Sequence, residues 1–160
     1  MSQFTTARVV SHKFFEIELR PDGIVWLKRS DTPYETIADV HTAYNQFLVL
    51  VDNWLLERRI LSGELGTRRR TNVAWLYDVR FAPSHRNDPE FEKAIQTRRV
   101  DLLERSPLLV VLVKTAAGVM QLRRLGVSGK GQVRTSNDFD EAIHWLLEQL
   151  AVLGQPAAPG

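Results

Sequence analysis

One segment near the middle of the chain constrains the fold more than any other: Asn72–Ala94, NVAWLYDVRFAPSHRNDPEFEKA. It opens with an almost entirely apolar run that ends at the charged Asp78. Such a run is typical of a central strand whose two faces are both covered in an α/β sheet. Asp88 followed by Pro89 is typical of the first turn of a helix. The segment therefore predicts a buried strand, a polar connection and a helix.

The rest of the chain alternates between strand and helix patterns in the same way. A Pro-Asp-Gly turn at 21–23 predicts a hairpin of two strands, and Thr32-Pro33-Tyr34-Glu35 has the pattern of a helix-capping box. Strands are expected over 14–20, 24–28, 72–80, 108–114 and 132–135, and helices over 32–58, 89–105 and 138–150. Residues 115–125 are compatible with a helix or a continuing strand, and Gly126 as a helix-ending residue favours the helix. The order β-β-α-β-α-β-α-β-α predicts an α/β fold with a single mixed, mostly parallel sheet and helices packed on it.

The chain has the size and composition of one globular domain. Of its 160 residues, 44% are hydrophobic and 25% are charged, which is typical of globular proteins. We expect a domain over 14–150, with an N-terminal tail or short edge extension at 1–13 and a flexible C-terminal tail at 151–160. A net charge of +2 is too small to indicate a nucleic-acid or membrane partner. With no cysteine, no uninterrupted apolar stretch of about 18 residues and no signal-peptide pattern, a cytoplasmic protein without a membrane span is expected.

The connection from Asp78 to Asp88 is the candidate site. It leaves the predicted sheet at the carboxyl edge, where α/β folds bind ligands and partners. In the functional interpretation, Arg80, His85 and Arg86 are donors and Phe81 is an apolar anchor for a protein partner. In the structural interpretation, Asp78 and Arg80 make local hydrogen bonds within an ordinary strand–helix connection. The sequence leaves both interpretations open.

No pattern in the sequence predicts catalysis, a metal or a cofactor. The hydrolase motif G-x-S-x-G is absent, and the glycines at 126–131 lack the spacing of a phosphate-binding loop. The histidines fall in four different elements, and the best metal-like spacing is the weak pair His144–Glu148. We therefore expect a protein that is not an enzyme, with no metal site and no cofactor.

Four stretches together resemble a known family. They are the helix opening at Thr32, the strand NVAWLYDVR with its polar exit, the apolar strand LLVVLVK, and the ending QVRTSNDFDEAIHWL. Over residues 14–150 this order is similar to STAS-type domains, and in particular to the SpoIIAA-like branch, which is related in fold to anti-sigma-factor antagonists. The resemblance implies a bacterial regulatory domain that acts by protein–protein binding; some members of such families bind small molecules or lipids.

The resemblance also implies a candidate phosphorylation site. The antagonists carry a phosphorylatable Ser or Thr near the start of the helix after the third strand, and Ser84 is the only hydroxyl in the corresponding stretch 80–88. Their Asp-x-Ser-Gly motif is absent here. Ser84 is therefore placed with the other candidate partner-binding residues.

The expected function is that of a non-enzymatic regulatory or scaffold domain that binds a protein partner through residues 78–95. One alternative is binding of nucleic acid or another anionic surface through Arg68, Arg69 and Arg70, although no aromatic residues are interleaved with them. Another is binding of a small molecule or lipid between the sheet and the helices. A homodimer is compatible with the sequence, but nothing in it requires one.

Overall fold

The computed structural model describes residues 8–62, 74–83, 88–105, 108–124 and 132–153. Within these ranges the chain forms six strands and four helices. In chain order they are β1 (Arg8–Ser11), β2 (Phe15–Leu19), β3 (Ile24–Arg29), α1 (Ile37–Ser62), β4 (Ala74–Asp78), α2 (Pro89–Arg105), β5 (Leu108–Leu112), α3 (Ala116–Arg124), β6 (Gln132–Ser136) and α4 (Phe139–Leu153).

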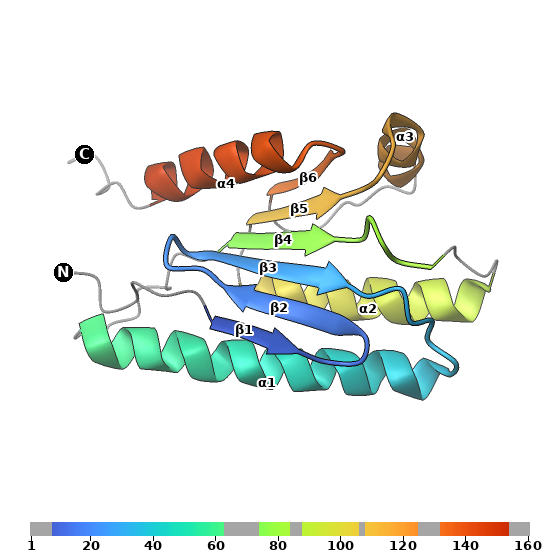
Figure 1. The fold of residues 1–160 in the computed structure, drawn as a ribbon, viewed down its shortest axis with the longest axis horizontal. Coiled ribbons are helices and arrows are strands. Elements are labelled where there is room, and N and C mark those ends of the chain that lie inside the picture. Colours follow the sequence, from blue (N-terminus) through green and yellow to red (C-terminus); the bar gives the residue numbers. More distant parts are fainter. Residues whose placement is uncertain (1–7, 63–73, 84–87, 106–107, 125–131, 154–160) are drawn as a thin grey trace.

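The strands form one mixed sheet whose spatial order, β1-β2-β3-β4-β5-β6, is also their order in the chain (Figure 1). The first three strands pair antiparallel, and β3 to β6 pair parallel. The predicted α/β class with a mixed sheet is confirmed, as is the hairpin of β2 and β3. Because β3 to β6 run in the same direction, their carboxyl ends share one edge of the sheet.

Helices cover both faces of the sheet. Helices α1 and α2 pack on one face and α4 packs on the other, each over its own apolar cluster (Figure 1). Strand β4 is buried on both faces: Trp75 and Tyr77 belong to the cluster under α1 and α2, whereas Leu76 belongs to the cluster under α4. This double burial explains why the sequence of β4 is apolar without alternation.

The structure extends the predicted domain at both ends. Arg8–Ser11, within the segment expected to be a tail or an edge extension, pairs with β2 as the edge strand β1. All four of its residues are exposed, so its sequence has no buried period that would have indicated a strand. At the other end, α4 continues to Leu153, three residues into the segment 151–160 expected to be a flexible tail.

Helix α1 begins at Ile37, five residues after the predicted capping residue Thr32, so the capping box predicted at 32–35 is wrong. The residue that caps the helix is Thr36: its Oγ1 accepts a hydrogen bond from the Asp39 backbone N–H at 3.2 Å. In return, the Asp39 carboxylate accepts hydrogen bonds from the backbone N–H groups of Glu35 and Thr36, both at 3.0 Å. The reciprocal cap therefore uses Asp at the third helical position, where the usual pattern has Glu or Gln.

Tertiary packing explains why the predicted cap is not used. Tyr34 is 9% exposed, and its ring packs against that of Phe14 at a centroid distance of 4.9 Å. Burying this side chain in the core anchors the segment before α1 to the end of the β2–β3 hairpin. The helix therefore begins only after Tyr34, at the next residue that can cap it.

Replacing Thr36 with alanine is expected to lower the free energy of unfolding by about 1 kcal/mol, because the Asp39 N–H loses its capping partner. Thr42→Ala, at an exposed position inside α1, is the control and should be neutral or slightly stabilising. Both are measured by urea unfolding. The backbone hydrogen bonds from Thr36 and Glu35 lower the pKa of Asp39. The contribution of Asp39 to the stability of the fold is therefore present above about pH 4 and is lost as the pH falls further.

Candidate functional site at the carboxyl edge of the sheet

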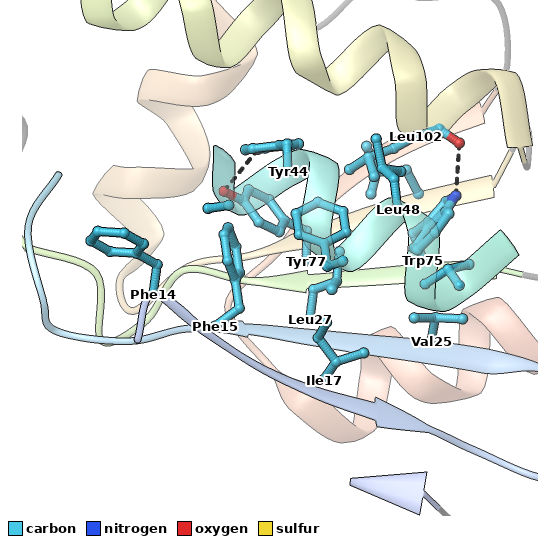
Figure 2. Packing of buried hydrophobic residues seen from close by; sticks show 14 of the residues in the cluster. Phe14, Phe15, Ile17, Val25, Leu27, Tyr44, Leu48, Trp75, Tyr77 and Leu102 are labelled. Carbon is cyan, nitrogen blue, oxygen red and sulfur yellow. Dashed lines mark hydrogen bonds between the residues drawn. The ribbon is translucent and has the colours of Figure 1, made fainter. Parts of the chain in front are cut away.

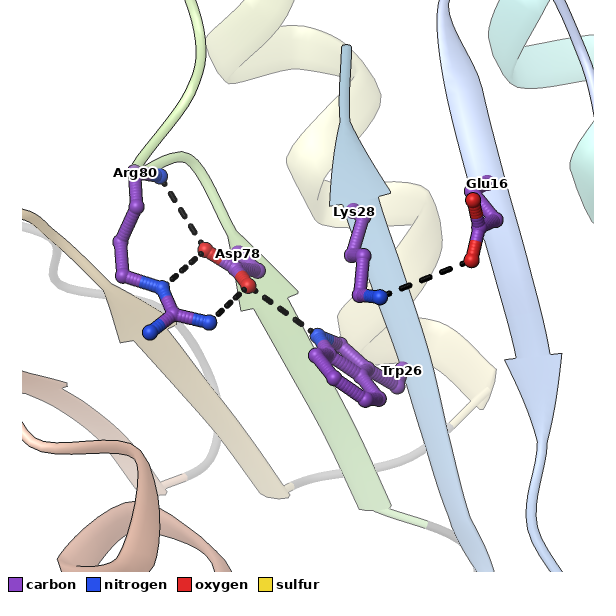
Figure 3. A network of polar contacts seen from close by, with 5 residues as sticks. All are labelled: Glu16, Trp26, Lys28, Asp78 and Arg80. Atoms are coloured by element: carbon purple, nitrogen blue, oxygen red, sulfur yellow. Dashed lines mark hydrogen bonds and ion pairs between the residues drawn. The ribbon is translucent and has the colours of Figure 1, made fainter.

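Asp78, the last residue of β4, lies at the centre of a polar network (Figure 3). The alternation of the strand directs its side chain toward the α4 face, where the side chain has no exposed surface. Its carboxylate accepts a hydrogen bond from Trp26 Nε1 at 3.2 Å. It accepts three more from Arg80, from the backbone N at 3.1 Å, Nε at 3.0 Å and Nη2 at 2.8 Å.

These bonds make a buried carboxylate tolerable. A buried charge is costly unless it is paired with good geometry, and the Nε and Nη2 atoms of Arg80 face the two carboxylate oxygens in parallel. The hydrogen bonds to Asp78 also raise the pKa of Arg80. Arg80 is therefore held by its own strand end, with the local hydrogen bonds to Asp78 that the structural interpretation expected.

Aromatic rings surround the Arg80 guanidinium. Its Cζ atom lies 5.7 Å from the ring centroids of both Phe81 and Phe139, the latter being the first residue of α4. Phe139 in turn packs on Trp26 at a centroid distance of 4.8 Å. The network thus joins β3, the end of β4 and the start of α4.

The network continues onto the open part of the same face. Lys28 Nζ lies 3.9 Å from the Trp26 ring centroid and 3.5 Å from a carboxylate oxygen of Glu16 on β2 (Figure 3). The Lys28 and Glu16 side chains are 32% and 47% exposed, so this outer pair contributes little stability. The Lys28 side chain nevertheless covers part of the Trp26 ring.

Phe81 differs from its neighbours because it is 62% exposed. It follows the clamped Arg80 directly at the carboxyl edge of the sheet, in the connection that leads to the first turn of α2. That turn is capped as predicted, with the Asp88 carboxylate accepting a hydrogen bond from the Glu90 N–H at 3.0 Å. Of the predicted site residues, Asp78, Arg80 and Phe81 are thus brought together.

Other predicted site residues lie outside the described part of the chain. They are Ser84, His85 and Arg86 in the connection to α2, and Arg68, Arg69 and Arg70 before β4. The glycine-rich stretch 126–131 lies outside it as well. The candidate phosphorylation of Ser84 and the proposed basic patch therefore remain predictions from the sequence.

Two members of the network, Trp26 and Phe139, escaped the sequence analysis. Trp26 Nε1 and the Asp78 carboxylate are 52 residues apart in the chain and meet only because β3 and β4 are neighbours. The alternation within β3 places Trp26 and Lys28 on the same face, but nothing in the sequence assigns Asp78 as their neighbour. The missing information was the strand order.

A second polar cluster lies at the same edge but on the opposite face, under α1 and α2. The Tyr44 hydroxyl donates a hydrogen bond to the Tyr77 hydroxyl at 3.2 Å (Figure 2). The Tyr34 hydroxyl is also buried and has no hydrogen-bond partner among the described residues. Burial raises the pKa of both Tyr34 and Tyr44, and the neighbouring Tyr77 raises each further.

The tyrosine pKa shifts predict a loss of stability at alkaline pH. Tyrosines of the unfolded chain ionise near pH 10, whereas the buried Tyr34 and Tyr44 keep their protons above this pH. Their contribution to the free energy of unfolding is therefore complete below about pH 10. It declines as the pH rises further, by up to about 1.4 kcal/mol per pH unit for each tyrosine. Urea midpoints at pH 9 and pH 11 measure the decline, which should be shallower in Tyr44→Phe; an equal slope would contradict this origin.

The histidine and acidic side chains form no metal centre in the described part of the chain. No group of three or more His, Cys, Asp or Glu residues there is arranged to hold an ion. The weak pair anticipated from spacing does form: His144 Nε2 lies 2.8 Å from a carboxylate oxygen of Glu148 on the exposed side of α4. None of the helices that the structure describes is sufficiently long and apolar to cross a membrane.

Comparison of the chain with protein-family models, with curated proteins and with solved structures finds no match. The resemblance to STAS-type domains therefore stays a prediction. A function has to be supported by the geometry of the two clusters at the carboxyl edge.

Proposed function

We propose that the chain is a non-enzymatic regulatory or scaffold domain that binds a protein partner through residues 78–95. The observation that carries the proposal is Phe81, a large aromatic side chain that is 62% exposed beside a rigid support. Aromatic residues of this kind are the usual anchors of protein interfaces. The resemblance to STAS-type domains, whose members act by protein–protein binding, supports the same class of function.

The clamp under Phe81 is what distinguishes it from an ordinary exposed hydrophobic residue. The backbone N–H and the guanidinium of the preceding Arg80 are both bonded to the buried Asp78 carboxylate. The backbone that carries Phe81 is therefore anchored at the preceding residue before a partner arrives, which reduces the conformational entropy lost on binding relative to a free loop.

The charges at the start of α2, within the same proposed segment 78–95, suggest the chemistry of the partner. Glu90 and Glu92 in the first turn are exposed, and the exposed Lys93 follows them. A partner with an apolar pocket for Phe81 and with Arg or Lys at the rim would complement this surface. Rim charges of this type contribute to association rate and specificity more than to affinity.

The decisive change is Phe81→Ala, which leaves the Asp78–Arg80 clamp intact. Loss of a central aromatic anchor should weaken binding by about 2 kcal/mol, or roughly 30-fold. Met120→Ala is the matched control, because Met120 is an exposed apolar residue of α3, 59% exposed, outside the proposed surface. Arg80→Glu is unsuitable, because it would place a second carboxylate beside the buried Asp78.

The experiment has two stages. Wild type and both variants are first used to capture partners from nuclease-treated lysate of the source, and the protein enriched by wild type is then purified and titrated against each. Binding that is weakened in Phe81→Ala and unchanged in Met120→Ala supports the proposal. Equal affinity of all three forms would contradict the site, and capture that requires nucleic acid and falls steeply with salt would favour the Arg68–Arg70 alternative.

A further inference from the structure

Arg29, the last residue of β3, is a buried cation on the face under α1 and α2. It is only 4% exposed. Its Nη1 atom donates to the backbone oxygens of Phe14 at 3.2 Å and Ser30 at 2.9 Å, and to Ser30 Oγ at 3.3 Å. Its Cζ atom lies 4.0 Å from the ring centroid of Tyr34. These contacts fix the guanidinium plane between the hairpin and the segment before α1.

One edge of this guanidinium has no hydrogen-bond acceptor among the described residues. The Nε and Nη2 atoms donate to no described residue, and no described carboxylate forms an ion pair with Arg29. Burying an uncompensated cation is costly, so an arginine in this position normally has an anion beside it. The contacts to carbonyl oxygens and aromatic rings offset only part of that cost.

Two other arginines of the same chain show what this edge can hold. Arg80 presents its Nε and Nη2 atoms to the carboxylate of Asp78, and Arg20 presents the same two atoms to Asp22. This side-on geometry is a common way in which arginine binds a carboxylate or a phosphate through two parallel hydrogen bonds. Arg29, more buried than either, has this edge without such an acceptor among the described residues.

Tyr34 supplies a second donor beside Arg29. Its buried hydroxyl has no hydrogen-bond acceptor among the described residues, and its ring centroid lies 4.0 Å from the Arg29 Cζ atom. Burial raises the pKa of Tyr34, and the nearby Arg29 guanidinium lowers it by a smaller amount. A buried polar group without a partner is destabilising, so such groups are rare unless a ligand or water completes their hydrogen bonding. The same acceptor could satisfy both this O–H and the free edge of Arg29.

We propose that Arg29 and Tyr34 bind an oxyanion, the carboxylate or phosphate group of a small-molecule ligand. Two anion oxygens accept hydrogen bonds from Nε and Nη2 of Arg29, and one of them also accepts from the Tyr34 hydroxyl. The ligand group is compact, because so little of Arg29 is exposed. This site is on the face under α1 and α2 and does not depend on the Phe81 surface.

The test follows the arginine Nε–H signals of the full chain by ¹⁵N NMR. Sodium phosphate and sodium acetate are titrated separately, with ionic strength held constant by sodium chloride. The signal that disappears in Arg29→Lys is assigned to Arg29, and it should shift saturably with at least one of the two anions. Phosphate alone would identify a phosphate ligand, acetate alone a carboxylate, and both a general oxyanion site; each result supports the proposal.

The variants separate this site from general ionic effects. Tyr34→Phe should weaken anion binding about tenfold, the value of one hydrogen bond to a charged group. Arg20→Lys is the control and should leave binding unchanged, because the Arg20 edge is already held by Asp22 at the surface. Absence of a saturable shift with both anions, or equal affinities in wild type and Tyr34→Phe, would overturn the proposal. These measurements need only folded wild type and folded Tyr34→Phe, so they test the proposal even if Arg29→Lys is unstable. In that case the Arg29 signal is assigned by triple-resonance NMR.

Discussion

Replacing Trp75 with alanine is expected to lower the free energy of unfolding by about 4–5 kcal/mol. Trp75 is fully buried in the middle of β4, among the largest such side chains of the core, and packs under α1 and α2. Its Nε1 atom also donates a hydrogen bond to the backbone oxygen of Leu102 at 2.8 Å, which ties α2 to the sheet (Figure 2). The substitution removes both the packing and the bond, and urea unfolding at neutral pH measures the loss.

Two further variants separate the contributions at this position. Trp75→Phe keeps an aromatic ring but loses the N–H donor, and should cost about 1–3 kcal/mol. Trp145→Ala, at a partly exposed position of α4, should cost clearly less than Trp75→Ala. If Trp75→Ala cost no more than Trp145→Ala, β4 would not be the centre of the core that the structure shows.

The second large effect is expected for Arg80→Met, at about 2–3 kcal/mol. The substitution leaves the Asp78 carboxylate buried with Trp26 as its remaining side-chain donor. Removing one partner of a buried pair generally costs about 3–5 kcal/mol, and we discount this range because the Arg80 side chain is 28% exposed and water can enter in its place.

A double-mutant cycle measures this interaction directly. Asp78→Asn removes the charge but keeps the shape, and in its presence Arg80→Met should cost much less than in wild type. Arg134→Met is the control, because the Arg134–Glu141 pair is exposed on both sides and should contribute no more than about 0.5 kcal/mol. A coupling energy between Asp78 and Arg80 as small as that control effect would contradict the buried clamp.

Local signals in the sequence were sufficient for most elements of the fold. The apolar run of β4, the alternation of β2 and the Asp88 cap of α2 each depend on neighbours in the chain, and the structure contains all three. The predicted start of α1 was wrong because Tyr34 is held in the core. This tertiary contact overrides the capping pattern at 32–35. Strand β1 was not predicted because all of its residues are exposed, so its sequence has no alternation of apolar and polar positions.

The candidate sites were predictable only in part, for a related reason. Asp78, Arg80 and Phe81 stand next to one another in the sequence, and their position after a buried strand was enough to single them out. Trp26 joins them through strand pairing. Arg29 appears in the sequence as one more charged residue at the end of a strand; its burial depends on Phe14 and Tyr34, which meet it only in the folded hairpin.

The agreement between strand order in space and strand order in the chain has a consequence for synthesis. A chain that leaves the ribosome with its N-terminus first can add each new strand to the free edge of a sheet that already exists. No later strand has to be inserted between two earlier ones. We therefore expect the β2–β3 hairpin and α1 to form first during translation, with α4 covering the second face only after β6 has been added.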